Sequence, residues 1–140
     1  MGWMPEPGSA LGRRLRRRLQ EEVVVWLTTV ASDGTPQPNP VWFITDGEEI
    51  VVFNRSDAWR LVHIRGRPRV TLNFNSTPSG GDILVVTGQA RLVEDAPPPH
   101  QVPDYVEKYG ESMRRISGSL EGFSAEYPVM LRILPDGVRS

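Results

Sequence analysis

The chain has 140 residues, of which 16 are basic and 17 acidic, and its formal net charge at pH 7 is -1. This length fits one compact domain, and the near-zero charge argues against a protein that coats nucleic acid, because that mode needs excess positive charge over a broad face. The chain has no cysteine, which excludes disulfides, thiolate zinc sites and a cysteine nucleophile.

The sequence gives no sign of a membrane segment. No apolar run approaches the roughly 20 residues that span a bilayer, and the N-terminus lacks the apolar core of a signal peptide. We therefore expect a cytoplasmic protein that binds neither membrane nor nucleic acid. Lys108 is the only lysine among 16 basic residues, and the chain is rich in Gly, Pro and Ala, a composition that points to a high-GC bacterium.

The N-terminal region is predicted to be a leader followed by a helix. Residues 1–10, with two prolines and two glycines, are expected to be a disordered leader, and residues 11–140 to form a single domain. An amphipathic helix is predicted next, because apolar residues recur at near-helical spacing: Leu11, Leu15, Leu19, Val23 and Trp26 or Leu27. Arginines at positions 13, 14, 16, 17 and 18 fill the other faces. A basic helix can bind membrane or nucleic acid, but we interpret these arginines as a solvated face.

Three antiparallel strands are predicted next. The apolar, β-branched run 25–31 is followed by Ser32-Asp33-Gly34, an extended segment ends at residues 41–44, and Asp46-Gly47 precedes the run 50–53. Asp-Gly between such runs favours a tight hairpin, because glycine accepts the positive φ of the turn. The prolines at 36, 38 and 40 cannot donate hydrogen bonds to a ladder, so this part of the second strand is expected at an edge or a bulge.

The rest of the chain predicts a barrel. A short helix over 56–65, capped by Ser56 or Asp57, is expected to bury Leu61 and Ile64 and to end at Gly66. Strands follow at 69–75, 83–93 and 127–134, with a turn at 76–81, a stiff break at prolines 97–99 and a helix over 102–113. The sum is a strand-dominated α+β domain whose short antiparallel strands favour a barrel.

Catalytic side chains are scarce. His63 and His100 are the only histidines, and neither stands beside an obvious serine or carboxylate partner, so a His-based triad or metal site has no support. Asp33, Asp46 and Asp82 are interpreted as turn formers. An enzyme of this composition would therefore depend on a bound cofactor.

Arginines surround the strand end and helix start near residue 55. Arg55 and Arg60 could converge on one phosphate beside the free amides of the helix start, whereas a solvated surface is the alternative for these two and for Arg65, Arg67 and Arg69. Trp42 and Trp59 could flank a planar ring, or Trp42 could belong to the core. No G-x-G-x-x-G or Walker motif is present.

Four segments in order resemble the pyridoxamine 5'-phosphate oxidase-related family of flavin- and deazaflavin-binding proteins, and within it the actinobacterial F420-dependent oxidoreductases. They are T-T-V-A-S-D-G-T-P-Q-P-N-P-V-W-F, F-N-R, W-R-L-V-H-I-R-G-R-P-R-V and D-I-L-V-V-T-G-Q-A-R-L. The resemblance runs from about residue 27 to 93 and returns at the C-terminal E-Y-P-V-M-L-R-I-L-P-D-G-V. It implies a split β-barrel that forms a homodimer, with two cofactor sites between the subunits.

The resemblance also implies which residues contact the cofactor. The ring would lie along Asn39, Pro40, Val41 and Trp42, and its phosphate at Phe53, Asn54, Arg55, Ala58, Trp59 and Arg60. Asn75 and Ser76 would add contacts from the same or the partner subunit. The family commonly has lysine at the position of Arg60 and often asparagine at that of His63; arginine keeps the charge but changes the geometry of a phosphate contact.

The expected function is that of an F420-dependent oxidoreductase, which moves a hydride between the cofactor and a small unsaturated or quinone-like substrate. FMN is the alternative cofactor, and a non-catalytic protein that binds F420, FMN or haem is the rival function. No residue is assigned as a catalytic acid or base, and no metal site is expected. The substrate-phosphate arginines of true pyridoxamine phosphate oxidases have no clear counterpart, which disfavours that reaction.

Overall fold

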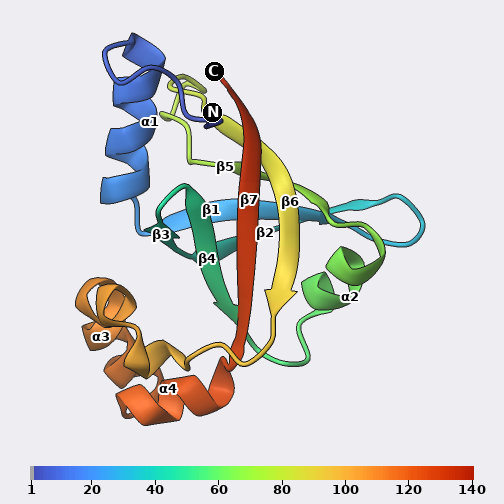
Figure 1. Ribbon diagram of the computed structural model, residues 1–140, viewed down its shortest axis with the longest axis vertical. Coiled ribbons are helices and arrows are strands. Elements are labelled where there is room, and N and C mark those ends of the chain that lie inside the picture. Colours follow the sequence, from blue (N-terminus) through green and yellow to red (C-terminus); the bar gives the residue numbers. More distant parts are fainter. Residues whose placement is uncertain (1) are drawn as a thin grey trace.

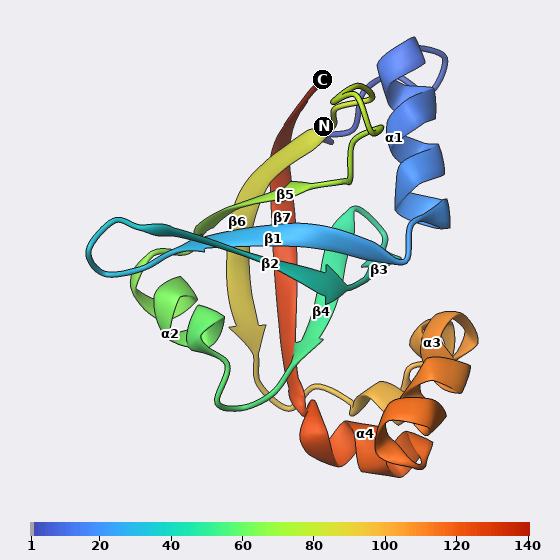
Figure 2. The same cartoon turned by 180° about the vertical axis from the view of Figure 1, so that it is seen from behind.

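Within residues 2–140, which the computed structural model describes, seven strands form one antiparallel sheet in the order β2-β1-β5-β6-β7-β4-β3. Figure 2 shows β1 and β2 crossing in front of β6 and β7, because the sheet curls on itself. This confirms the predicted strand-dominated split barrel. The strands are β1 Val24–Val30, β2 Pro36–Trp42, β3 Ile44–Asp46, β4 Glu49–Asn54, β5 Arg69–Asn73, β6 Val85–Val93 and β7 Val129–Arg139.

The helices lie around the ends of the sheet (Figure 1). Helix α1 (Ala10–Glu21) lies near the two termini, and the helices α3 (Pro103–Ser117) and α4 (Leu120–Glu126) lie together at the opposite end. Helix α2 (Trp59–Gly66) follows β4 in the chain, and the short 3-10 helix η1 (Pro99–Gln101) precedes α3. The sequence reading missed α4 and ended the preceding helix too early. The break between the two falls at Gly118, whose φ of 81° ends α3, and Ser119 then caps α4.

The prolines of β2 place that strand at an edge of the sheet, as predicted. β2 pairs with β1 along its whole length, from Val30–Pro36 to Val24–Trp42. Since a proline has no N–H, the residues that exchange hydrogen bonds with β1 are those between the prolines, and all three proline nitrogens lie on the outer side. That outer edge therefore offers carbonyl acceptors but no donors from residue 36 to residue 40.

The predicted second strand is divided at Phe43, and only its last part pairs with the third strand: Ile44, which belongs to β3, lies opposite Val51 of β4. The chain leaves β2 after Trp42, and the predicted Asp46-Gly47 turn, where Gly47 has a φ of 63°, joins the short β3 to β4. The predicted antiparallel arrangement is confirmed for β1 with β2 and for β3 with β4; what the sequence did not predict is the break at Phe43 and the pairing of β4 with β7. β2 and β4 instead face one another across an open seam in the barrel.

Tyr109 of α3 holds the chain at the point where β2 ends. Its buried hydroxyl accepts a hydrogen bond from the Phe43 N–H (2.9 Å) and donates to the Val23 carbonyl (2.6 Å). Lys108 donates from Nζ to the Phe43 carbonyl (2.9 Å), 3.8 Å from the centroid of the Phe43 ring. The polar groups that the strand break exposes are thus satisfied by one helix. Burial lowers the pKa of Lys108 to about 8.

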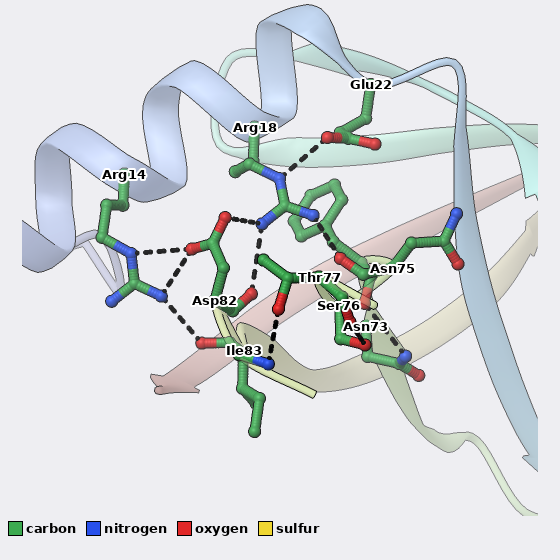
Figure 3. Close-up of polar contacts among 11 residues, drawn as sticks. Arg14, Arg18, Glu22, Asn73, Asn75, Ser76, Thr77, Asp82 and Ile83 are labelled. Carbon is green, nitrogen blue, oxygen red and sulfur yellow. Dashed lines mark hydrogen bonds and ion pairs between the residues drawn. The ribbon is translucent and has the colours of Figure 1, made fainter. Parts of the chain in front are cut away.

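Helix α1 is fastened to the loop before β6 by a cluster of charges (Figure 3). Arg18 is 6% exposed, pairs with Asp82 (2.7 Å) and Glu22 (2.8 Å), and donates to the Asn75 carbonyl. Arg14 also pairs with Asp82, and its hydrogen bond lowers the pKa of that carboxyl more than any other cause. The prediction that all these arginines form a solvated face is therefore wrong for Arg18.

The predicted extent of the first helix is also wrong at its C-terminal end. The backbone turns extended at Glu22, and the β-branched residues that follow enter β1. Upstream, the expected disordered leader of residues 1–10 has contacts that the sequence did not predict: the Trp3 indole donates to the Glu48 carbonyl (3.1 Å) and Ser9 caps α1. Met1 lies outside the described residues.

We expect Tyr109→Phe to lower the free energy of unfolding by about 1–3 kcal/mol, because the buried Phe43 N–H loses its acceptor. Urea titration followed by circular dichroism measures the change. Tyr105→Phe is the matched control: Tyr105 lies one helical turn earlier, is equally buried, and its hydroxyl makes no hydrogen bond within residues 2–140. Equal losses for both variants would contradict the assigned role of the Tyr109 hydroxyl.

Candidate functional site

The open seam between β2 and β4 contains a cavity of about 250 Å³, which we call the seam cavity. Helices α3 and α4 close it at one end. It is lined by Pro40, Val41 and Trp42 of β2, Phe53 of β4, Arg60 of α2, and Tyr105, Ile116, Phe123 and Tyr127 of the C-terminal part. Five predicted ring or phosphate contacts, those on β2, β4 and α2, therefore meet around one cavity.

A second cavity of about 510 Å³, the α2 groove, lies on the other side of Arg60. Its lining residues come from β2 and α2 and are Gln37, Asn39, Ala58, Trp59, Arg60 and His63. Arg60 lines both cavities, so the two are neighbours on either side of this residue. A ring in one part and an anionic chain in the other would both contact this arginine.

Arg60 is half-buried and has no acidic partner within residues 2–140. Its Nε donates to the Asn54 carboxamide oxygen (2.5 Å), which leaves both terminal nitrogens without a protein acceptor in that range. Burial lowers the pKa of Arg60, and Tyr127 partly opposes this effect. A half-buried guanidinium whose terminal nitrogens are free is suited to bind an anion such as phosphate.

Asn54 holds Arg60 in place and is itself inaccessible to a ligand. It is fully buried, and its Nδ2 donates to the carbonyls of Val52 and Val129, both at 3.1 Å. With Nδ2 fixed in this way, the amide oxygen is oriented toward Arg60. Asn54 was predicted as a cofactor contact, and the structure places it one layer behind the cavities.

Arg55 lies outside both cavities. Its guanidinium is within 3.6 Å of Asp57 and Glu126 and lies 5.6 Å from the centroid of the Tyr127 ring. Tyr127, first, and then these two carboxylates raise the pKa of Arg55. The structure therefore does not bring Arg55 and Arg60 to one point, as the sequence had suggested.

The start of α2 differs from the sequence prediction. Ser56 and Asp57 form a turn, and the helix begins after Ala58, whose side chain cannot cap it. The first backbone amides of α2 are consequently left without a side-chain acceptor, next to the α2 groove. The predicted burial of Leu61 and Ile64 is confirmed.

The two tryptophans lie in different surroundings. Trp42 stacks on Tyr109, with ring centroids 4.6 Å apart, and on Phe123 at 5.4 Å, so most of its ring belongs to an aromatic cluster under α3 and α4. Trp59 is 76% exposed on α2. Trp42 thus forms a fixed wall of the seam cavity, whereas Trp59 is a rim residue of the α2 groove.

Asn75 and Ser76 line neither cavity of this chain. The Asn75 carbonyl accepts from Arg18, its side-chain oxygen accepts from the Trp26 indole (2.8 Å), and Ser76 is exposed on the loop before β6. Figure 3 shows both residues near α1. Their predicted contact to a cofactor stays a prediction for the partner subunit.

Tyr105 is the site residue that the sequence reading missed most clearly. It is 1% exposed and lines the seam cavity, and its hydroxyl makes no hydrogen bond within residues 2–140. Burial raises the pKa of Tyr105, which keeps the hydroxyl protonated and able to donate. Tyr105 and Tyr109 are four residues apart, which places both side chains on one face of α3. This spacing is the feature of the sequence from which a role for Tyr105 could have been predicted.

Membrane-spanning helices and metal-binding clusters are both absent from the residues that the structure describes. Between residues 2 and 140 no helix is long and apolar enough to cross a membrane. The same range holds no group of three or more His, Asp or Glu residues that could bind a metal ion. The side chains that line the two cavities carry aromatic, amide, hydroxyl, imidazole and guanidinium groups.

Several solved structures share this architecture, whereas no curated protein matches the chain. Among solved structures, an F420 reductase is 23% identical, with a TM-score of 0.66 over 89% of this chain and 94% of its own. General stress protein 26 from Bacillus anthracis is 20% identical (TM-score 0.68; 90% and 89% covered), and the haem storage protein HutZ from Vibrio cholerae is 17% identical (TM-score 0.64; 94% and 94% covered).

At these identities the solved structures show a shared fold and no more. The family model described as pyridoxamine 5'-phosphate oxidase, however, matches residues 11–138, nearly the whole chain. The chain therefore belongs to the pyridoxamine 5'-phosphate oxidase family.

Proposed function

We propose that the protein is a cytoplasmic oxidoreductase of the actinobacterial F420-dependent branch, with FMN as the alternative cofactor. The observation that carries the proposal is Arg60, a half-buried arginine without an acidic partner in the described chain, at the junction of two cavities. The deazaflavin is the first choice because the sequence resembles the F420-dependent branch, and an F420 reductase is among the structures that share the fold. The substrate would be a small unsaturated or quinone-like molecule.

The residues present fit a ligand that has both an aromatic ring and an anionic chain. Arg60 would hold the phosphate, the β2 segment from Pro40 to Trp42 would support the ring, and the helices α3 and α4 would exclude water from the seam cavity. Tyr105 would donate a hydrogen bond to an acceptor atom in this cavity. When bound, the cofactor would supply the hydride chemistry, which none of these side chains can perform.

A non-catalytic carrier of F420, FMN or haem is the second candidate, because a haem storage protein shares the fold. The two candidates differ in turnover. Protein incubated with reduced F420 and a panel of enones and quinones should restore the deazaflavin absorbance if it is an enzyme. Binding of a cofactor without any such change would support the carrier.

Arg60→Ala is expected to weaken binding of the preferred cofactor by about 1.5–3 kcal/mol, because a charge-assisted phosphate contact is lost. Titration of the apoprotein with F420 and with FMN gives the dissociation constants. Arg65→Ala is the matched control, since Arg65 is exposed on the same helix and lines neither cavity. Unchanged affinity in Arg60→Ala would remove this residue from the site.

Tyr105→Phe is expected to leave stability unchanged and to slow turnover of the best enone or quinone about tenfold, the value of roughly one hydrogen bond. The hydroxyl makes no hydrogen bond within residues 2–140, so its removal breaks no such contact in the described protein. Steady-state rates of the variant and the wild type measure the effect. Equal rates in both would show that the hydroxyl does not contact the reacting molecules.

We further propose that the active form is a homodimer in which the partner subunit covers the α2 groove. Trp59 and Val62 are three residues apart on one face of α2 and are 76% and 52% exposed, a large apolar area beside an open groove. A second copy of the chain would bury this face and complete the site.

Light scattering during gel filtration should give twice the 15.7 kDa mass of one chain, and Trp59→Arg should shift the protein toward the monomer. Ile83→Arg is the control, because Ile83 is also exposed but lies beside α1, far along the chain from this face. A monomeric wild type would contradict the proposal.

A further inference from the structure

His63 is held in a fixed orientation inside the α2 groove. Its Nδ1 lies 2.8 Å from the hydroxyl oxygen of Thr29, a β1 residue that is 1% exposed. The threonine hydroxyl can accept from a protonated Nδ1 or donate to an unprotonated one, so it tolerates both charge states of the ring. The imidazole is therefore oriented without being restricted to one protonation state.

The other ring nitrogen of His63 is free. Nε2 makes no hydrogen bond within residues 2–140, and His63 lines the same groove as Arg60, three residues earlier on α2. Residues three apart lie on one helix face, so the imidazole and the free guanidinium nitrogens lie on the same side of the helix. Trp59, one turn before His63, lies at the exposed rim of the same groove.

Within residues 2–140, Thr29 and the residues that line the groove with His63 include no carboxylate. β1 contributes the neutral Thr29, and β2 contributes the amides Gln37 and Asn39. On its own helix, Arg60 has terminal nitrogens without an acceptor in residues 2–140, and Arg65 is exposed. Arg67, just beyond the helix end, donates to the Val30 carbonyl. On β6 the charged residue is Arg91, which pairs with Glu49 (3.6 Å). A protonated His63 would therefore find its negative partner in a bound anion.

We propose that His63 is a second anion-binding residue beside Arg60, and that its imidazole takes up a proton when a phosphate-bearing ligand enters the α2 groove. This inference rests on the proposed anion site at Arg60. It makes binding of phosphate-bearing ligands stronger at pH 6 than at pH 8, because imidazoles change charge in this range. Thr29 acts as a positioning residue, since it fixes the ring through the nitrogen that does not face the ligand.

The test compares FMN with riboflavin, which has the same ring but no phosphate. The dissociation constant of FMN is measured from pH 6 to pH 8 for the wild type, His63→Asn and His63→Gln. Titration of the FMN phosphate itself affects all three proteins alike, so the ratio of wild type to variant isolates the imidazole. We expect FMN binding by the wild type to weaken about fivefold or more, relative to the variants, over this range. Riboflavin binding should be the same in all three.

Proton NMR reports on the His63 imidazole directly, and it can be used with an anion that is not a cofactor. The chain has two histidines, so the His63 imidazole signals are those that disappear in His63→Asn. FMN and inorganic pyrophosphate should each move these signals toward the protonated position, while the His100 signals, on a ring bonded to Ser124, stay unchanged. Unmoved His63 signals, or identical pH profiles for wild type and His63→Asn, would overturn the inference.

The outcomes separate this inference from the proposed function. If pyrophosphate moves the His63 signals but neither F420 nor FMN binds, the cofactor assignment fails and the anion site stands. If FMN or F420 binds with equal affinity to His63→Asn at all pH values, the cofactor assignment stands and the role of His63 is refuted. If no probe binds or moves the signals, both are refuted.

Discussion

Three prolines on one edge of the sheet decide where this protein can hold a ligand. In β2 they occupy alternate positions, so their nitrogens all lie on the side away from β1, and the outer edge has carbonyls without donors. Such an edge cannot accept a further strand as a regular ladder partner, and β4, which lies across the seam from β2, pairs with β3 and β7. The barrel stays open here, and the gap becomes the seam cavity.

An open seam exposes backbone and side-chain polar groups, and two tertiary contacts satisfy them. The Tyr109 hydroxyl binds the backbone on both sides of the strand break, and its ring stacks on Trp42. Asn54 uses its amide to join β4 and β7 and to orient Arg60. The same contacts that stabilise the split barrel therefore also fix the side chains that surround the cavities, and a ligand would enter a site that is largely formed beforehand.

The parts of this structure that could be predicted from the sequence are those set by local chemistry. Prolines without donors predicted the edge strand, Asp46-Gly47 predicted a hairpin, and the spacing of Leu61 and Ile64 predicted a buried helix face. Contacts between residues far apart in the sequence were not predictable in this way. One example is the break at Phe43, which divides the predicted second strand into β2 and β3. Another is the ion pair with Glu126, which holds Arg55 away from the cavities. Tyr105 was missed because its importance depends on α4, which closes the cavity and was itself not predicted.

Lys108 has a consequence for how the fold responds to alkaline solution. It is the only lysine of the chain, and the burial that accompanies its hydrogen bond to Phe43 lowers its pKa to about 8, against the opposing effect of Glu22. The unfolded chain therefore binds this proton more tightly than the native state does. Between about pH 8 and the usual lysine pKa near 10.5, unfolding requires proton uptake at this amine, so its contribution to the folding equilibrium becomes more favourable as the solution is made more basic.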